Sequence, residues 1–298
     1  MRKIAIIFLS IFSFLIGIEQ TAKSSPIAKS WVYATILIEN EWEEKGTGFL
    51  VAREIGQDKV KVFLCTNKHV LNLKKELRDN ATKVTLHLNV KEVGGKIFGK
   101  PYEFALISPD GKKRWKEHPE TDVDVLAFDV TDLIVTLPEM EKKWADYSLF
   151  ADIKVLSEQN ITIGDEIMVV GYPLGYRQGD SNFPIVRQGI IASQIGEKFI
   201  EEMIKDGKKI TRVFRGFLID GGLIPGSSGS PVVLKPVTGR IVGNQIIMGE
   251  SKPYLLGIVA ETRYAPVKTN IGEIPSFAGL GLAFDALTVK ETIELFFK

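Results

Sequence analysis

The sequence predicts an all-β protein, built as a barrel or as sandwiched sheets. From Trp31 onward, short runs rich in Val, Ile, Phe and Leu recur, and Gly, Pro, Asp and Asn separate them at the spacing of strands and turns. The scarcity of long helical segments between these runs argues against a doubly wound α/β sheet. The runs are WVYATILIE, GTGFLVA, KVKVFLCT, KVTLHLNV, DVLAFDV, EIMVVGYP, RIVGNQIIM and YLLGIVAE.

The runs fall into two β-rich halves of similar size. A break near residues 150–163 separates them, so we expect one half over residues 28–155 and the other over residues 163–298. No internal repeat or low-complexity segment interrupts the pattern. A chain of 298 residues with 45% hydrophobic content can bury a full core in such an arrangement.

Two segments have the spacing of helices. Residues 197–209 place apolar side chains three and four positions apart and end at Gly207, which predicts one helix. The second helix is expected at the end of the chain. There, Thr288 and Glu291 form a capping-box pattern ahead of further apolar residues.

The N-terminus has the layout of a secretory signal peptide over residues 1–24. Two basic residues precede an apolar stretch at residues 4–18, and Ala22 and Ser24 supply the small residues before a cleavage site. An uncleaved membrane anchor is the alternative, but a spanning helix needs about 20 apolar residues, which favours cleavage. We therefore expect an exported protein, periplasmic or secreted, that is not inserted in a membrane once the signal is removed.

Charge and cysteine content exclude some classes of protein. The net charge is +1, from 38 basic and 37 acidic residues, so no overall field would attract nucleic acid or anionic lipid. We expect no nucleic-acid partner. The single cysteine, Cys65, excludes an intramolecular disulfide framework, and its apolar surroundings predict a buried, unreactive thiol.

The string IPGSSGSPVV at residues 224–233 has the character of a nucleophile loop. Its glycines admit unusual backbone angles, and two converging N–H groups, predicted from Gly226 and Ser228, could hold the oxyanion of a tetrahedral intermediate. Ser228 would be the nucleophile. On its own, such a string is more often a plain Gly/Ser turn, so the interpretation depends on finding a base.

The candidate base is one of three histidines, His69, His87 and His118, all of which precede Ser228. This order excludes sites in which the acid and the histidine follow the serine, and it permits the order His, Asp, Ser. His69 ends an apolar run that would deliver it to a domain edge. His87 alternates with apolar neighbours as on a strand, and His118 lies in a charged segment that predicts a solvated loop. We therefore choose His69.

The candidate acid lies in DVDVLAFDV at residues 122–130. A carboxylate at the start of a hydrophobic strand is costly to bury unless it has a partner, such as an imidazole N–H. Asp122 and Asp124 point to the same face of a strand, so spacing does not separate them. An ordinary solvent-facing strand start is the other interpretation.

Together these motifs resemble the trypsin-like serine peptidases, and within them the Deg or HtrA-like proteases. The aspartate motif of that family is matched best from Asp124. The similar segments occur in the family's order from about residue 46 to 290. They are GTGFLV at 46–51, TNKHV at 66–70, DVLAFDV at 124–130, VGYPLG at 170–175, VRQGIIAS at 186–193, IDGGLIPGSSGSP, LGIVAET and GLGLAF at 279–284.

The resemblance implies two six-stranded antiparallel β-barrels, an active site in the cleft between them and a short C-terminal helix. It implies a serine endopeptidase that acts on polypeptides, unfolded proteins among them, through an acyl-enzyme. His69 would be the base, Asp124 the orienting acid and Ser228 the nucleophile, with an oxyanion hole at Gly226 and Ser228. The substrate pocket would be formed by Gly222, Leu223, Ala260, Glu261 and Thr262.

The sequence departs from the family pattern at three positions, Ser227, Ser230 and Leu126. Because Ser227 is not an acid, we do not expect activation through a buried N-terminal salt bridge. Gly222 at the base of the pocket argues against basic residues before the cut, and Leu223 and Ile224 favour small or medium apolar ones. We also expect no appended PDZ module and no metal or cofactor, since no cluster has metal-ligand spacing.

Two other functions use the same fold. One is a peptide-binding pseudoprotease without activity, and the other is an esterase or acyltransferase with the same triad. Retention of all three triad residue types favours the active peptidase.

Overall fold

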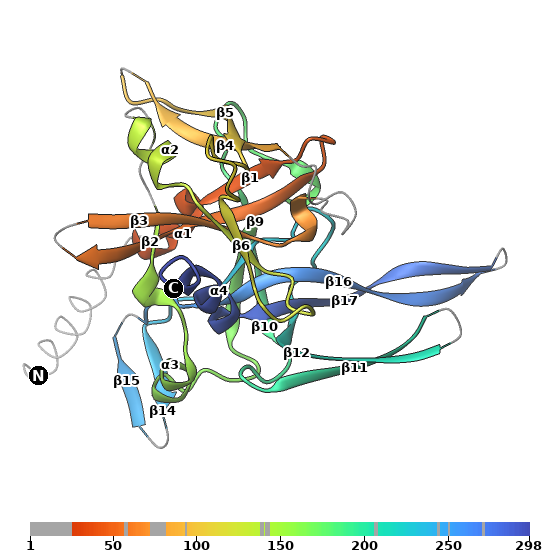
Figure 1. Cartoon of the computed structure of the whole chain (residues 1–298). Coiled ribbons are helices and arrows are strands. Elements are labelled where there is room, and N and C mark those ends of the chain that lie inside the picture. Colours follow the sequence, from red (N-terminus) through yellow and green to blue (C-terminus); the bar gives the residue numbers. More distant parts are fainter. Residues whose placement is uncertain are drawn as a thin grey trace, which may run out of the picture.

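The computed structural model describes residues 26–56, 59–71, 82–92, 94–137, 140, 144–205, 208–242, 245–249, 251–269 and 272–298 (Figure 1). The expected signal peptide lies outside these residues. Within them, no helix has both the length and the apolar character needed to cross a membrane.

The N-terminal half is a mostly antiparallel sheet in the order β5-β4-β1-β2-β3-β7-β6, with the short β8 parallel to β2. A bridge between Ile107 and Lys113 brings the chain after β5 beside the chain before β6. The elements are α1 (Pro26–Ala34), β1 (Thr35–Glu39), β2 (Lys45–Gly56), β3 (Lys59–Thr66), η2 (His69–Leu71), β4 (Lys83–Lys91), β5 (Ile97–Ala105), β6 (Trp115–Glu117), β7 (Leu126–Asp129), α2 (Thr131–Thr136), β8 (Ala145–Asp146) and η3 (Tyr147–Leu149).

The C-terminal half is an antiparallel sheet in the order β10-β9-β13-β16-β17-β12-β11. Since β10 also pairs with β12, the strands from β10 through β12 close into a ring. The elements are α3 (Ile153–Glu158), β9 (Glu166–Gly171), η4 (Pro173–Gly175), β10 (Ile185–Ile191), β11 (Lys198–Lys205), β12 (Lys208–Asp220), β13 (Pro231–Leu234), β14 (Gly239–Val242), β15 (Gln245–Met248), β16 (Leu255–Thr269), β17 (Gly272–Asp285) and α4 (Ala286–Glu294).

The two halves share a buried apolar core. Val289 and Ile293 of α4 are fully buried in one cluster with Phe63 of the first sheet and Phe284 of the second. Trp31 of α1 belongs to the same cluster, and its indole N–H donates to the carbonyl of Pro253, 3.0 Å away. Burial of this kind is the main source of stability in a fold without disulfides. The predicted all-β class and the C-terminal helix are confirmed.

The helix predicted at residues 197–209 is wrong. Its residues 198–205 form β11 and its residues 208–209 begin β12, and this antiparallel pair projects from the body beside β16 and β17, while Gly207 lies outside the described residues (Figure 1). Phe199 packs against Phe214 across the strands, with ring centroids 5.6 Å apart, and Glu201 pairs with Arg212 at 3.2 Å. These cross-strand contacts outweigh the local helical spacing.

The C-terminal helix has a different N-cap from the predicted one. Asp285 is the cap, and its carboxylate accepts from the backbone N–H of Thr288 at 3.0 Å. Thr288 therefore lies inside the first turn. The side chain of Glu291 binds Arg215 rather than folding back on the helix start. Asp285 ends strand β17 and is a strong capping residue type, so the helix begins there.

Candidate active site

Strand β2 connects the first sheet to the predicted nucleophile loop through Thr47. The backbone N–H of Thr47 donates to the carbonyl of Ser228 at 2.9 Å, and its hydroxyl donates to the carbonyl of Gly226 at 3.1 Å. The N–H of Tyr172 donates to the same hydroxyl at 3.0 Å. Thr47 is fully buried. Sequence reasoning assigned no role to Thr47, although its place in the GTGF motif was a signal for one.

The structure brings His69 together with Asp124. His69 begins η2 directly after β3, and its backbone N–H donates to Asp124 Oδ1 at 3.2 Å. Its ring Nδ1 is in hydrogen-bond contact with Asp124 Oδ2. The side-chain amide of Asn67 donates to the carbonyl of Asp124 at 2.6 Å, which fixes the backbone of the acid. Asp122, which the sequence left as an alternative, is exposed to solvent.

His69 and Asp124 each have a pKa shifted from the usual value. Burial alone would raise the pKa of Asp124, but the hydrogen bond and charge of His69, with the backbone N–H groups of His69 and Lys68, hold it below its usual value. Burial would lower the pKa of His69, yet the hydrogen bond and charge of Asp124 and the charge of Glu261 raise it above its usual value. The imidazole is thus prepared to accept a proton.

Ser228 lies in the loop between β12 and β13, and its hydroxyl is hydrogen-bonded to a backbone carbonyl. Ser228 Oγ donates to the carbonyl of Ala260 at 3.1 Å. In the described part of the chain, no hydrogen bond joins this hydroxyl to His69. Transfer of the hydroxyl proton to His69 would therefore require the O–H to leave the carbonyl of Ala260.

The backbone around Ser228 requires glycine before it. Gly226 has a φ of +87°, in the left-handed region. A Cβ at this position would lie 2.6 Å from the carbonyl oxygen of Tyr172 and 2.7 Å from the backbone N of Leu174. Both constraints exclude larger residues. The loop conformation predicted from the Gly/Ser string thus has a steric basis.

The residues predicted to form the substrate pocket have different exposures. Gly222 is exposed, and Glu261 and Thr262 are half-buried. Leu223 and Ala260 are buried; Leu223 packs in the core of the C-terminal half and against Gly281, where a Cβ would lie 1.9 Å from Leu223 Cδ1. In this conformation, Leu223 offers no surface to a substrate.

Glu261 belongs to a charged cluster that links the two projecting hairpins. Its carboxylate pairs with Arg212 of β12 and with Arg263 of β16, each at 3.1 Å. Glu201 of β11 pairs with the same two arginines at 3.2 and 2.7 Å. Because Glu261 also raises the pKa of His69, this cluster is electrostatically coupled to the base.

The other two histidines lie outside this site. His118 is buried, and its Nε2 lies 3.1 Å from Glu291, so the predicted solvated loop is wrong at this position. Its partner comes from the C-terminal helix, far along the chain, which local charge could not reveal. His87 lies on β4 as predicted, with Nε2 3.3 Å from Glu39.

Cys65 is fully buried, and burial raises the pKa of its thiol, as expected for an unreactive side chain. Among the described residues, no group of three or more His, Cys, Asp and Glu side chains could hold a metal ion.

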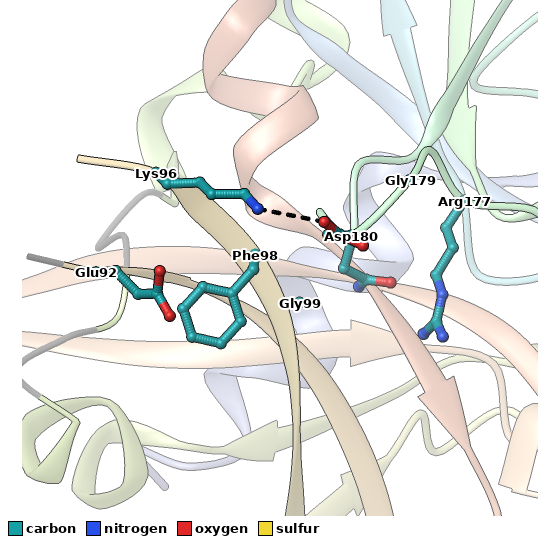
Figure 2. Close-up of a pocket in the computed structure, with 8 residues that line it drawn as sticks. Glu92, Lys96, Phe98, Gly99, Arg177, Gly179 and Asp180 are labelled. Carbon is teal, nitrogen blue, oxygen red and sulfur yellow. Dashed lines mark hydrogen bonds and ion pairs between the residues drawn. The ribbon is translucent and has the colours of Figure 1, made fainter. Parts of the chain in front are cut away.

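A separate cavity of 480 Å³ opens between the β4–β5 hairpin and the chain after β9 (Figure 2). Lys96 and Asp180 form an ion pair of 3.3 Å across it. None of its lining residues is His69, Asp124 or Ser228, so this cavity is distinct from the candidate site. Its lining residues are Glu92, Lys96, Phe98, Gly99, Arg177, Gly179, Asp180 and Asn182.

Comparisons with known proteins give one family. No curated protein matches the chain. Among solved structures, the active form of the Rv3671c protease from M. tuberculosis is 17% identical, with a TM-score of 0.45 over 90% of this chain and 82% of that chain. Deg5 is 14% identical, with a TM-score of 0.47 over 91% of each chain. The trypsin-like peptidase domain matches residues 46–243, and the chain therefore belongs to the trypsin-like peptidase family.

Proposed function

We propose that the protein is a serine endopeptidase in which His69, Asp124 and Ser228 act as one catalytic unit. The observation that carries this proposal is the contact of the His69 ring with Asp124. Thr66, three residues before His69, borders the loop of Ser228, since a Cβ at Gly229 would lie 2.7 Å from its hydroxyl oxygen. Thr47 connects that loop to β2, whose neighbour β3 leads into His69. Membership of the trypsin-like peptidase family supports the same reaction class.

The proposed reaction begins when the side chain of Ser228 turns from the carbonyl of Ala260 toward His69 Nε2. The imidazole accepts the hydroxyl proton as the oxygen attacks a peptide carbonyl, and it then gives this proton to the leaving amine. Water releases the acyl group in a second step through the same base. Asp124 holds the ring in the tautomer with its proton on Nδ1 and stabilises the imidazolium.

The N–H groups of Gly226 and Ser228 would stabilise the oxyanion. Preorganised donors of this kind act where charge develops in the transition state. Both groups belong to the segment that Thr47 fixes by its hydrogen bonds to the carbonyls of Gly226 and Ser228. Their positions are thereby set by contacts from the other half of the molecule.

The proposed substrates are polypeptides, unfolded proteins among them, as in the Deg and HtrA-like proteases that the sequence motifs resemble. Gly222 supplies no charge that would select basic residues before the cut. We further propose that the protein is exported and acts in the periplasm or outside the cell, on the basis of its N-terminal signal pattern.

A second candidate function is a peptide-binding pseudoprotease of the same fold. One observation favours it: the hydroxyl of Ser228 is bound to the carbonyl of Ala260 and not to the base. An esterase or acyltransferase would use the same side chains as the peptidase, so it differs in substrate alone.

Digestion of casein by the protein lacking residues 1–24, compared with its Ser228→Ala variant, tests the proposal. We expect the first protein to cleave casein and the variant to have no detectable activity, with the same circular dichroism spectrum. Labelling by a fluorophosphonate without casein cleavage would favour the esterase. Absence of both labelling and cleavage would favour the pseudoprotease, and equal cleavage by the variant would remove Ser228 from the reaction.

A further inference from the structure

Arg187 on β10 reaches the nucleophile loop with its guanidinium group. It lies opposite Val169 of β9 in the sheet, and its side chain extends away from its own strand. One terminal nitrogen donates to the carbonyl of Gly222, and the other donates to the hydroxyl of Ser227 at 2.6 Å. A single side chain thus binds both ends of the segment from 222 to 227.

The setting of this guanidinium is unusual for a positive charge. The side chain is half-buried, and desolvation lowers its pKa. No carboxylate of the described residues lies within ion-pair distance of it, in contrast to Arg212, Arg215, Arg240 and Arg263, which all have one. Since a partly buried cation is costly without compensation, its hydrogen bonds to the loop are what hold it in place.

The segment that Arg187 contacts is also held by core packing and by a backbone bond: Leu223 is fully buried, and the N–H of Leu174 donates to the carbonyl of Pro225 at 2.8 Å. Three glycines with positive φ, Gly222, Gly226 and Gly229, allow the chain to turn between β12 and β13. The far end is fixed by Thr47 and by the bond from Gly229 N–H to the carbonyl of Val259 at 2.9 Å. At the near end, the hydrogen bonds of Arg187 to Gly222 and Ser227 add to the core packing of Leu223.

We propose that Arg187 is a positioning residue that fixes the oxyanion-binding segment of this site. The inference depends on the proposed function, since it assigns Arg187 a role through Gly226 and Ser228. Ser227 directly precedes the nucleophile and is itself buried. By binding Ser227 and Gly222 together, the guanidinium sets the orientation of the N–H groups between them. The planar fork of arginine suits two acceptors at once, whereas a lysine offers one compact charge.

Two variants measure this role. Arg187→Met keeps an unbranched apolar stem and removes every donor, and Arg187→Lys keeps the charge. We expect kcat for a peptide substrate to fall about 100-fold in Arg187→Met, since a displacement of about 1 Å at a catalytic group has an effect of this size. KM should change by less than about threefold, and Arg187→Lys should recover part of kcat.

Hydrogen exchange gives a readout that does not need catalysis. Amides of residues 221–230 should exchange faster in Arg187→Met, whereas strands β9 and β13 should keep their protection. Arg240→Met is the matched control, because that arginine lies in the same half and is bound to Asp165 at 2.6 Å, away from the loop. In the Arg240→Met variant, hydrogen exchange of residues 221–230 and kcat should match those of the unchanged protein.

A milder variant keeps the test valid if Arg187→Met folds poorly. Ser227→Ala removes one acceptor of the guanidinium, and we expect a fall in kcat of about fivefold to tenfold that is not multiplied when Arg187→Lys is added. Unchanged loop exchange and unchanged kcat in all Arg187 variants would overturn the proposal. If loop exchange is faster in Arg187→Met but the unchanged protein neither cleaves nor labels, the proposed function is rejected and the structural contact is kept.

Discussion

The two sides of the candidate active site differ in how their side chains are held. On one side, both the backbone N–H and the ring of His69 are in hydrogen-bond contact with Asp124. On the other side, the backbone of Ser228 is fixed by Thr47, but its hydroxyl is bound to the carbonyl of Ala260. The acid and base are therefore assembled by contacts near one strand end, whereas the nucleophile depends on the conformation of a loop.

The largest effect on the assembled side is expected from Asp124→Asn. The amide cannot stabilise the imidazolium and favours the wrong tautomer, so kcat should fall by about 10⁴-fold. Asp122→Asn is the matched control, because Asp122 is two residues away and exposed. Its kcat should change by less than about threefold in the same peptide-cleavage assay. A larger loss in the Asp122 variant than in the Asp124 variant would show that the acid is assigned to the wrong residue.

On the loop side, Gly226→Ala should lower kcat by about 10²–10³-fold, the effect of losing one oxyanion donor. The added Cβ would meet the backbone of Tyr172 and Leu174, so the N–H of residue 226 cannot keep its place. Gly164→Ala is the control: it has a similar φ of +91°, and nothing lies within 4 Å of its added Cβ.

The measurement combines kcat with the thermal unfolding midpoint of both variants. Both should lose a similar increment of stability from strained backbone, about 1–2 kcal/mol, with some further loss at Gly226 from the contact. Only the Gly226 variant should lose turnover. Equal kcat in the two variants would contradict the assignment of the oxyanion donors.

A smaller effect is expected from Glu261, whose charge acts on the base, His69. The charge of Glu261 raises the pKa of His69, and the neutral imidazole is the active base. Glu261→Gln should therefore lower the pKa of His69 and move the acidic limb of the kcat/KM profile to lower pH, by a few tenths of a pH unit. Glu201→Gln removes a charge from the same arginine cluster and serves as control, with a smaller shift. A shift to higher pH in Glu261→Gln would contradict this coupling.

Much of the fold and site could be predicted from the sequence because its signals are local. Alternating apolar runs indicate strands, and a Gly/Ser string indicates a tight loop. The period of two in a strand could not separate Asp122 from Asp124, since it places both on one face. In the structure both precede β7, and Asp124 is distinguished by its hydrogen bonds with Asn67 and His69, which follow β3 in the chain.

The errors came from contacts between residues distant in the chain. The helix predicted at residues 197–209 is wrong because β11 pairs with β12. The charged surroundings of His118 predicted a solvated loop, but His118 contacts Glu291 of α4. Arg187 gave no sequence signal at all. Its acceptors lie 35 and 40 positions further along the chain, and only the fold brings them together.

The most direct test of the central claim is the site and rate of covalent labelling by a fluorophosphonate. Peptide mapping by mass spectrometry should place the adduct on Ser228, and His69→Ala should slow its formation by about 10²–10⁴-fold, the usual contribution of a general base. This result would show that the hydroxyl leaves the carbonyl of Ala260 and is activated by the imidazole. An adduct on another residue, or labelling of Ser228 at the same rate without His69, would contradict the account.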